Sequence, residues 1–67
     1  MRLKIDKVND ALCLRLDDSV ALIESEGVEP RVVLDLDRHG RVIGIEILAL
    51  STRAEPDRLR VFQLETA

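Results

Sequence analysis

The sequence is poor in aromatic residues, cysteine and clustered positive charge. Phe62 is its one aromatic residue and Cys13 its one cysteine. A single cysteine excludes a disulfide within the chain and is typical of a cytoplasmic protein. Proteins bind nucleic acid through clustered Lys and Arg, and single strands also through aromatic stacking platforms. The 10 basic residues are scattered among 13 acidic ones, for a net charge of −3, so we expect no nucleic-acid partner.

Long apolar runs are also missing. A helix that crosses a bilayer needs about 20 apolar residues, whereas the longest candidate here, residues 43–50, is interrupted by Gly44 and Glu46. The first residues alternate between polar and apolar and contain no apolar core of a signal peptide. We therefore expect no membrane association.

The length limits how much of the chain can be buried. With 67 residues we expect one domain over residues 1–67, and such a domain buries only about 60% of the surface that its unfolded chain exposes. Domains this small usually need disulfides, a metal or a partner subunit. Because 46% of the residues are hydrophobic and no disulfide can form, we expect a homodimer. The acidic surface would also suit a small basic protein as partner.

The apolar pattern predicts a mainly β (α+β) fold, with a small antiparallel sheet of four to five strands built from two hairpins. Residues 2–6 and 11–16 alternate with a period of two and are separated by turn residues, which is typical of a hairpin. Residues 20–25 are predicted as a further strand, because Gly27 and Pro30 leave too little length for a stable helix.

The second half of the chain holds one predicted helix and an ambiguous segment. Thr52 and Glu55 have the spacing of a capping box, which predicts one short helix near residues 49–56 that Pro56 limits. Residues 58–65 begin with alternation and are predicted as a last strand on the sheet edge. A short helix is the alternative for this segment.

Two β-branched runs on either side of Asp37 and Gly40 predict the second hairpin. A three-residue bulged turn would place Asp37 opposite Arg41. The pairs that follow from this register are Leu36 with Val42, Leu34 with Gly44, and Val32 with Glu46. Both faces of the hairpin would then be substantially apolar, so we expect one face on the core and part of the other under the last segment or a second subunit.

Much of this pattern resembles a known family. The resemblance lies in Asp6 and Lys7, in residues 9–16, 33–37 and 40–48, and in Ser51. On these residues the chain is similar to the small bacterial and archaeal domain-of-unknown-function family 2283, although that family usually carries Tyr where Cys13 stands. The resemblance implies a compact β-rich domain with a short helical element and no assigned reaction. Members are often encoded beside small toxins, which implies an antitoxin-like role as the partner of a toxin.

The acidic residues are the candidate functional residues, with Asp10, Asp35 and Glu46 foremost. A catalytic carboxylate pair must point at one place, and a zinc site normally needs several His or Cys ligands, of which the chain has only His39 and Cys13. We therefore predict no enzyme and no catalytic, cofactor or metal site. The alternative is a small metal- or ligand-binding domain or enzyme, which requires the three carboxylates to converge on a cleft.

Glu46 stands within an isoleucine-rich strand, where a carboxylate is rarely buried unless it is paired. We expect an ion pair with Arg15 or Arg31, with a recognition or catalytic carboxylate as the alternative. Cys13 alternates with leucines and is expected to pack as a small hydrophobic residue rather than react as a thiol. His39 is expected to be a turn residue.

These observations predict a non-enzymatic protein-interaction module that dimerises. The motivation is an excess of apolar side chains in a chain that is too short to bury them. The candidate interface residues are Leu12, Leu14, Val33 and Ile45.

Overall fold

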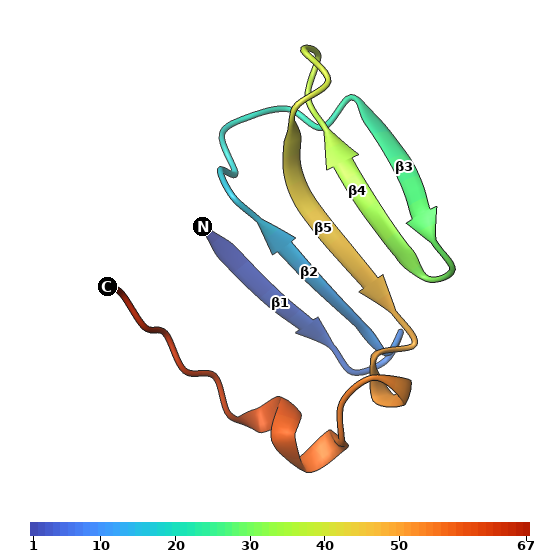
Figure 1. Ribbon diagram of the computed structural model, residues 1–67, viewed down its shortest axis with the longest axis vertical. Coiled ribbons are helices and arrows are strands. Elements are labelled where there is room, and N and C mark those ends of the chain that lie inside the picture. The colour runs from blue at the N-terminus through green and yellow to red at the C-terminus, as the bar shows by residue number, and fades with distance from the viewer.

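The computed structural model describes residues 1–67 and consists of one antiparallel sheet (Figure 1). The strands are β1 (Arg2–Asp6), β2 (Ala11–Arg15), β3 (Glu24–Glu29), β4 (Val32–Leu36) and β5 (Val42–Leu48). Their order across the sheet is β1-β2-β5-β4-β3, so β5 lies in the middle and β1 and β3 form the edges. The predicted mainly β fold with an antiparallel sheet is confirmed.

The hairpin between β4 and β5 has the turn that the sequence predicts. The Asp37 N–H donates to the Arg41 carbonyl at 3.0 Å, and the Gly40 N–H donates to the Asp37 carbonyl at 3.0 Å. Gly40 has a φ of 73°, in the left-handed region that glycine enters at little cost. These contacts close a type I turn with a bulged glycine.

A β-bulge in β5 changes the register beyond this turn. The predicted pairing holds next to the turn, but Ile43 is then inserted as an extra residue. As a result Val33, rather than the predicted Val32, lies opposite Glu46. Because a shift of one residue moves every later side chain to the other face, the predicted placement of Glu46 among apolar residues is wrong.

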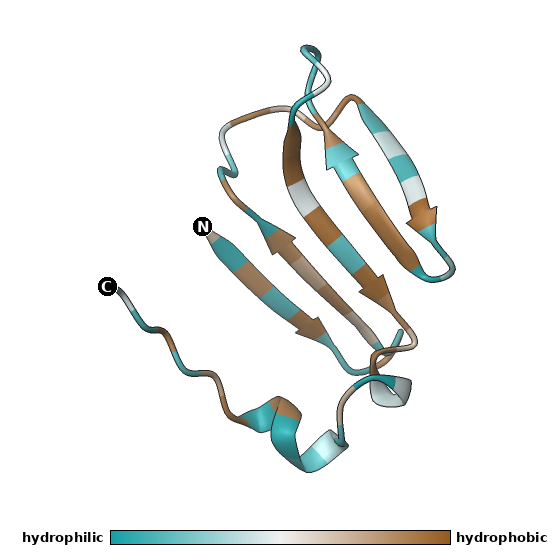
Figure 2. Cartoon of the chain, viewed as in Figure 1, coloured by the Kyte–Doolittle hydropathy of each residue, from teal (hydrophilic) through white to brown (hydrophobic).

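The bulge sorts the side chains by polarity onto two faces, and the alternation of brown and teal along the strands follows this sorting (Figure 2). We call one the apolar face; its side chains are those of Leu3, Ile5, Leu12, Leu14, Val32, Leu34, Ile45 and Ile47. We call the other the polar face; it carries Arg2, Lys4, Cys13, Arg15, Asp35 and Glu46. The expectation that both faces are apolar is therefore wrong.

Three segments differ from their predicted structure. The third strand is Glu24–Glu29 rather than residues 20–25, because residues 17–23 are used to carry the chain from β2 to the far edge of the sheet (Figure 1). The predicted helix near 49–56 is replaced by two 3-10 turns, η1 (Leu50–Thr52) and η2 (Pro56–Arg60). The structure contains no helix that is long and apolar enough to cross a membrane.

The predicted edge strand over residues 58–65 is also wrong. Residues 58–60 belong to η2, and residues 61–67, which we call the tail, form no regular structure. Pro56 stands at the start of η2, where its fixed φ favours a helical turn over a strand. Phe62 in the tail is 70% exposed.

The sheet has almost no covered core. The buried apolar residues are Ala11, Ile43 and Leu50, and no large side chain is fully buried. Ala11 lies on the polar face, opposite Leu48, and Leu50 belongs to η1. The side chains of the apolar face are half-buried, apart from the exposed Leu3, so the rest of the chain covers this layer only in part.

Gly44 is required by the close packing at the centre of the sheet. A Cβ at this position would lie 2.8 Å from the Leu14 carbonyl oxygen and 3.1 Å from Oδ2 of Asp35. We predict that Gly44→Ala lowers the free energy of unfolding by about 1–3 kcal/mol, in the range of other overpacked sites. The matched control is Gly27→Ala, since a Cβ there meets nothing within 4 Å and should change stability by only about 0.5 kcal/mol. Urea denaturation followed by circular dichroism measures both, and equal midpoints would contradict the packing argument.

Candidate functional site

Two carboxyl groups meet on the polar face at the middle of the sheet. Asp35 in β4 is only 4% exposed, and its Oδ1 accepts a hydrogen bond from the Ser25 hydroxyl at 3.1 Å. Because Asp35 lies opposite Gly44, the missing side chain leaves room for its carboxylate over the sheet. Glu46 projects from the same face of β5, one diagonal position away.

Their proximity raises the pKa of Glu46 above its usual value. The first cause is a hydrogen bond that the protonated Glu46 carboxyl makes with Asp35, followed by burial and by the negative charge of Asp35. Arg15 acts in the opposite direction, since its positive charge favours the ionised carboxylate. Glu46 forms no ion pair with Arg15 or Arg31 within 4 Å, so the predicted ion pair is wrong.

Cationic side chains border this carboxyl pair. A shallow cavity of about 250 Å³ on the polar face is lined by Arg2, Lys4, Cys13, Arg15, Asp35 and Glu46, among others. Arg15 donates to the Val20 carbonyl at 3.3 Å, which ties the site to the segment between β2 and β3. The sequence pattern gave no sign that Asp35 and Glu46 would be neighbours, because their proximity depends on the extra residue in β5.

Cys13 lies on the polar face beside Glu46, half-buried. Burial raises the pKa of its thiol, and the negative charge of Glu46 raises it further. A raised pKa keeps the thiol protonated and poorly nucleophilic. The residue therefore has the properties of a packing residue, on the polar face rather than among the leucines of the apolar face.

Asp10 does not join the other two candidate carboxylates. It lies at the turn between β1 and β2, where it accepts hydrogen bonds from the Ser51 backbone N–H at 3.0 Å and the Ser51 hydroxyl at 2.7 Å. These contacts fasten the turn to η1 across 41 residues of sequence. Asp10 thus makes a structural contact, and the convergence of Asp10, Asp35 and Glu46 on one cleft, which the alternative of a metal- or ligand-binding domain or enzyme requires, is not formed. No group of three His, Cys, Asp or Glu side chains is arranged to hold a metal ion.

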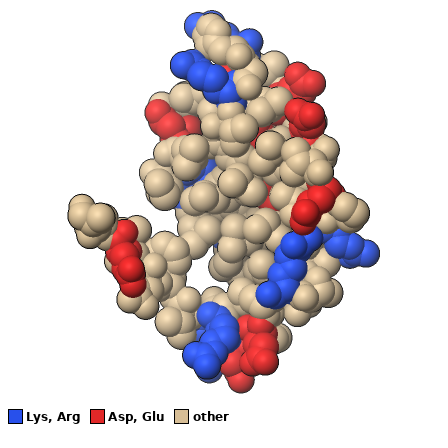
Figure 3. Space-filling model, viewed as in Figure 1, with Lys and Arg blue, Asp and Glu red and all other residues tan.

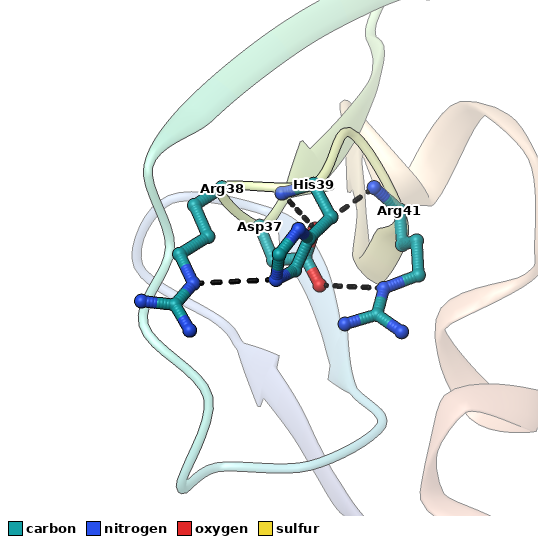
Figure 4. Close-up of polar contacts among 4 residues, drawn as sticks. All are labelled: Asp37, Arg38, His39 and Arg41. Atoms are coloured by element: carbon teal, nitrogen blue, oxygen red, sulfur yellow. Dashed lines mark hydrogen bonds and ion pairs between the residues drawn. The ribbon is translucent and has the colours of Figure 1, made fainter.

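Asp37 organises the tip of the hairpin between β4 and β5 (Figure 4). Its Oδ1 accepts from the backbone N–H groups of His39 and Arg41, at 2.8 and 2.9 Å, and its Oδ2 accepts from Arg41 Nε at 3.1 Å. These bonds, with the one from the Arg41 backbone foremost, lower the pKa of Asp37. Arg38 Nε donates to His39 Nε2 at 3.3 Å, so His39 is an exposed turn residue, as predicted.

The apolar face is a second candidate for a functional surface. The side of the molecule turned to the viewer in Figure 3 is almost free of charge over the middle of the sheet, and charged side chains lie around its rim. Three of the four candidate interface residues, Leu12, Leu14 and Ile45, lie on the apolar face. Val33 lies on the polar face, because it is opposite Glu46.

The fold and these two faces define a small all-β domain built on a single sheet. Residues 2–51 match a family described as "Protein of unknown function (DUF2283)". The match covers most of the chain, which therefore belongs to this family, as its resemblance predicts. No curated protein and no solved structure matches the chain.

The carboxyl pair of Asp35 and Glu46 makes the folded protein less stable as pH rises. A raised pKa means that the folded state binds the Glu46 proton more tightly than the unfolded state does, so the protonated carboxyl contributes to the free energy of unfolding. This contribution is complete below the ordinary pKa of 4.5 and is lost as pH rises through the raised pKa. Glu46→Gln keeps a neutral hydrogen-bonding group and removes the titration. We predict that its melting temperature equals that of the unmodified protein near pH 4 and exceeds it at pH 8.

Thermal denaturation from pH 4 to pH 8 tests this prediction. Glu65→Gln removes one carboxylate from the exposed tail and serves as the control for the loss of one charge. A difference between Glu46→Gln and the unmodified protein that stays constant over this range would contradict the assignment.

Proposed function

We propose that this protein is a non-enzymatic protein-interaction module whose apolar face pairs with the same face of a second copy. The observation that carries the proposal is the incomplete burial of the apolar face in a chain with no fully buried large side chain. Burial of apolar side chains is the dominant favourable term in folding and in most protein association. A second copy supplies the missing layer, since two such faces would form a sheet-on-sheet core.

The exposed surface area of the chain supports pairing with a second copy. Folded monomers of 7.6 kDa expose about 4300 Å² on average, whereas this chain exposes 5444 Å². The projecting tail contributes to the excess, which is roughly 1100 Å² against the average monomer. One side of a standard protein interface buries about 800 Å², which is similar in size to this excess.

The distribution of polar groups supports the same proposal. Protein interfaces have an apolar centre that is depleted of charge and a polar rim. The apolar face has this arrangement, with isoleucines of β5 at its centre and the glutamates of β3 at one edge. An enzyme or metal site has less support, because two of its three proposed carboxylates meet and Asp10 does not.

A basic partner protein, such as a toxin, would bind at the acidic edge of the sheet that β3 forms. All residues of β3 are exposed, and Glu24, Glu26 and Glu29 are among them without any basic residue. Co-purification from cells tests for such a partner. Repeated recovery of the protein alone would count against it.

We predict that Ile45→Lys converts the dimer to monomer, because a charge at the centre of the apolar face cannot remain solvated in a dry interface. The expected rise in the dimer dissociation constant is about 30-fold or more, the size of a hot-spot effect. The matched control is Val33→Lys, which adds the same charge to an equally half-buried position on the polar face. Sedimentation equilibrium measures both, with circular dichroism to confirm that each variant is folded.

Leu14→Lys, opposite Ile45 on the apolar face, provides a second test if Ile45→Lys does not fold. Phe62→Asp tests whether the tail of the same chain is the cover instead. The proposal predicts that Phe62→Asp leaves dimerisation unchanged. A folded monomer of the unmodified protein at micromolar concentration would overturn the proposal.

A further inference from the structure

We infer that the two copies pair about a two-fold axis that runs along the strands through β5, so that β3 of each copy lies over β1 of its partner. This inference rests on the proposed pairing of the apolar faces and specifies its geometry. Its starting observation is the opposite charge of the two edges of the sheet. β1 contains Arg2, Lys4 and one acidic residue, Asp6, and is followed by Lys7, whereas β3 contains three glutamates and no basic residue.

The registers of the strands align the apolar face in rows. One row crosses the whole sheet and contains Leu3, Leu14, Ile45, Leu34 and Glu26. The next row contains Ile5, Leu12, Ile47, Val32 and Glu29. Each row is therefore apolar in the middle and acidic at the β3 end. These glutamates point to the face that the partner would cover.

Only two symmetric arrangements stack one such face on another with the strands aligned, within the usual angle of about 30°. An axis across the strands places β3 over β3 of the partner. An axis along the strands keeps each row at one height and reverses its direction. In that second arrangement Ile45 faces the partner's Ile45, Leu14 faces the partner's Leu34, and Leu3 faces the partner's Glu26.

The charges select between the two arrangements. Glu29 is paired with Arg53 of its own chain at 2.9 Å, but Glu24 and Glu26 form no ion pair. An axis across the strands would bring Glu24 and Glu26 of both copies together, and like charges at an interface are unfavourable. An axis along the strands places these glutamates over β1, where Arg2 and Lys4 flank Leu3. Arg2 is paired with Asp18 at 3.3 Å, whereas Lys4 forms no ion pair within its own chain. The long side chains of Arg and Lys can reach around an edge strand to a nearby carboxylate. Complementary charge thus favours the axis along the strands.

Site-directed cross-linking distinguishes the arrangements. All variants carry Cys13→Ser, so that each has one introduced cysteine. We expect a mixture of Leu3→Cys and Glu26→Cys proteins to form a cross-linked heterodimer, several-fold more abundant than the homodimers from either variant alone. A short bis-maleimide is the reagent, because packed sheets lie about 10 Å apart, which is too far for a disulfide. Mass spectrometry identifies each product.

Ile45→Cys is the control, because the centre of the sheet meets itself in either arrangement. Cross-linked Ile45→Cys together with the mixed Leu3→Cys and Glu26→Cys product supports the inference. Cross-linked Ile45→Cys together with Leu3→Cys homodimer overturns the inference and leaves the proposed pairing of the faces intact. A monomer in sedimentation, with no cross-link at Ile45, overturns both.

Discussion

The extra residue in β5 determines which side of the sheet each later side chain occupies. Without the bulge at Ile43, the alternation of β4 against β5 would place Glu46 among the aliphatic residues and Val33 among the isoleucines. With the bulge, the charged side chains of β1, β2, β4 and β5 lie on one face and most of their apolar side chains lie on the other, with Val33 and Leu48 among the exceptions. A single inserted residue can do this because the side-chain period of a strand is two. The two faces, and hence both the candidate interface and the carboxyl pair, depend on it.

Separating the side chains in this way leaves a sheet that has a hydrophobic layer but no second layer to complete a core. Domains normally consist of at least two packed layers, because a sheet with one apolar face must bury that face against another element. This chain has only 3-10 turns besides its strands, and these lie at one end of the sheet (Figure 1). Under the proposed pairing, a second copy of the chain supplies this layer.

Features that depend on neighbouring residues could be predicted from the sequence, whereas features that depend on the pairing of distant segments could not. The turn at Asp37 and Gly40 and the strands of the two hairpins could be predicted, because turn residues and β-branched runs act over a few positions. The bulge could not be predicted, because isoleucine is typical of regular strands and Ile43 therefore gives no sign of an extra residue. The bond between Asp10 and Ser51 spans 41 residues, and only the folded sheet brings them together.

The carboxylates of this small domain act on stability in opposite directions. Hydrogen bonds lower the pKa of Asp6, Asp17 and Asp37, with Asn9, Ser19 and the Arg41 backbone as the leading donors. These groups favour the folded state above their ordinary value of 3.8, and this contribution is lost as pH falls. Glu46 favours the folded state at low pH, and its contribution is lost as pH rises through its raised pKa.

The aspartates accept hydrogen bonds from residues within their own turns. The raised pKa of Glu46 depends instead on Asp35 in the neighbouring strand. The two contributions overlap between the ordinary aspartate value of 3.8 and the raised pKa of Glu46. The carboxylates together therefore favour the folded state most in mildly acidic solution. Above that range the ionised Glu46 lies beside the negative charge of Asp35, and the repulsion between the two carboxylates opposes the folded state.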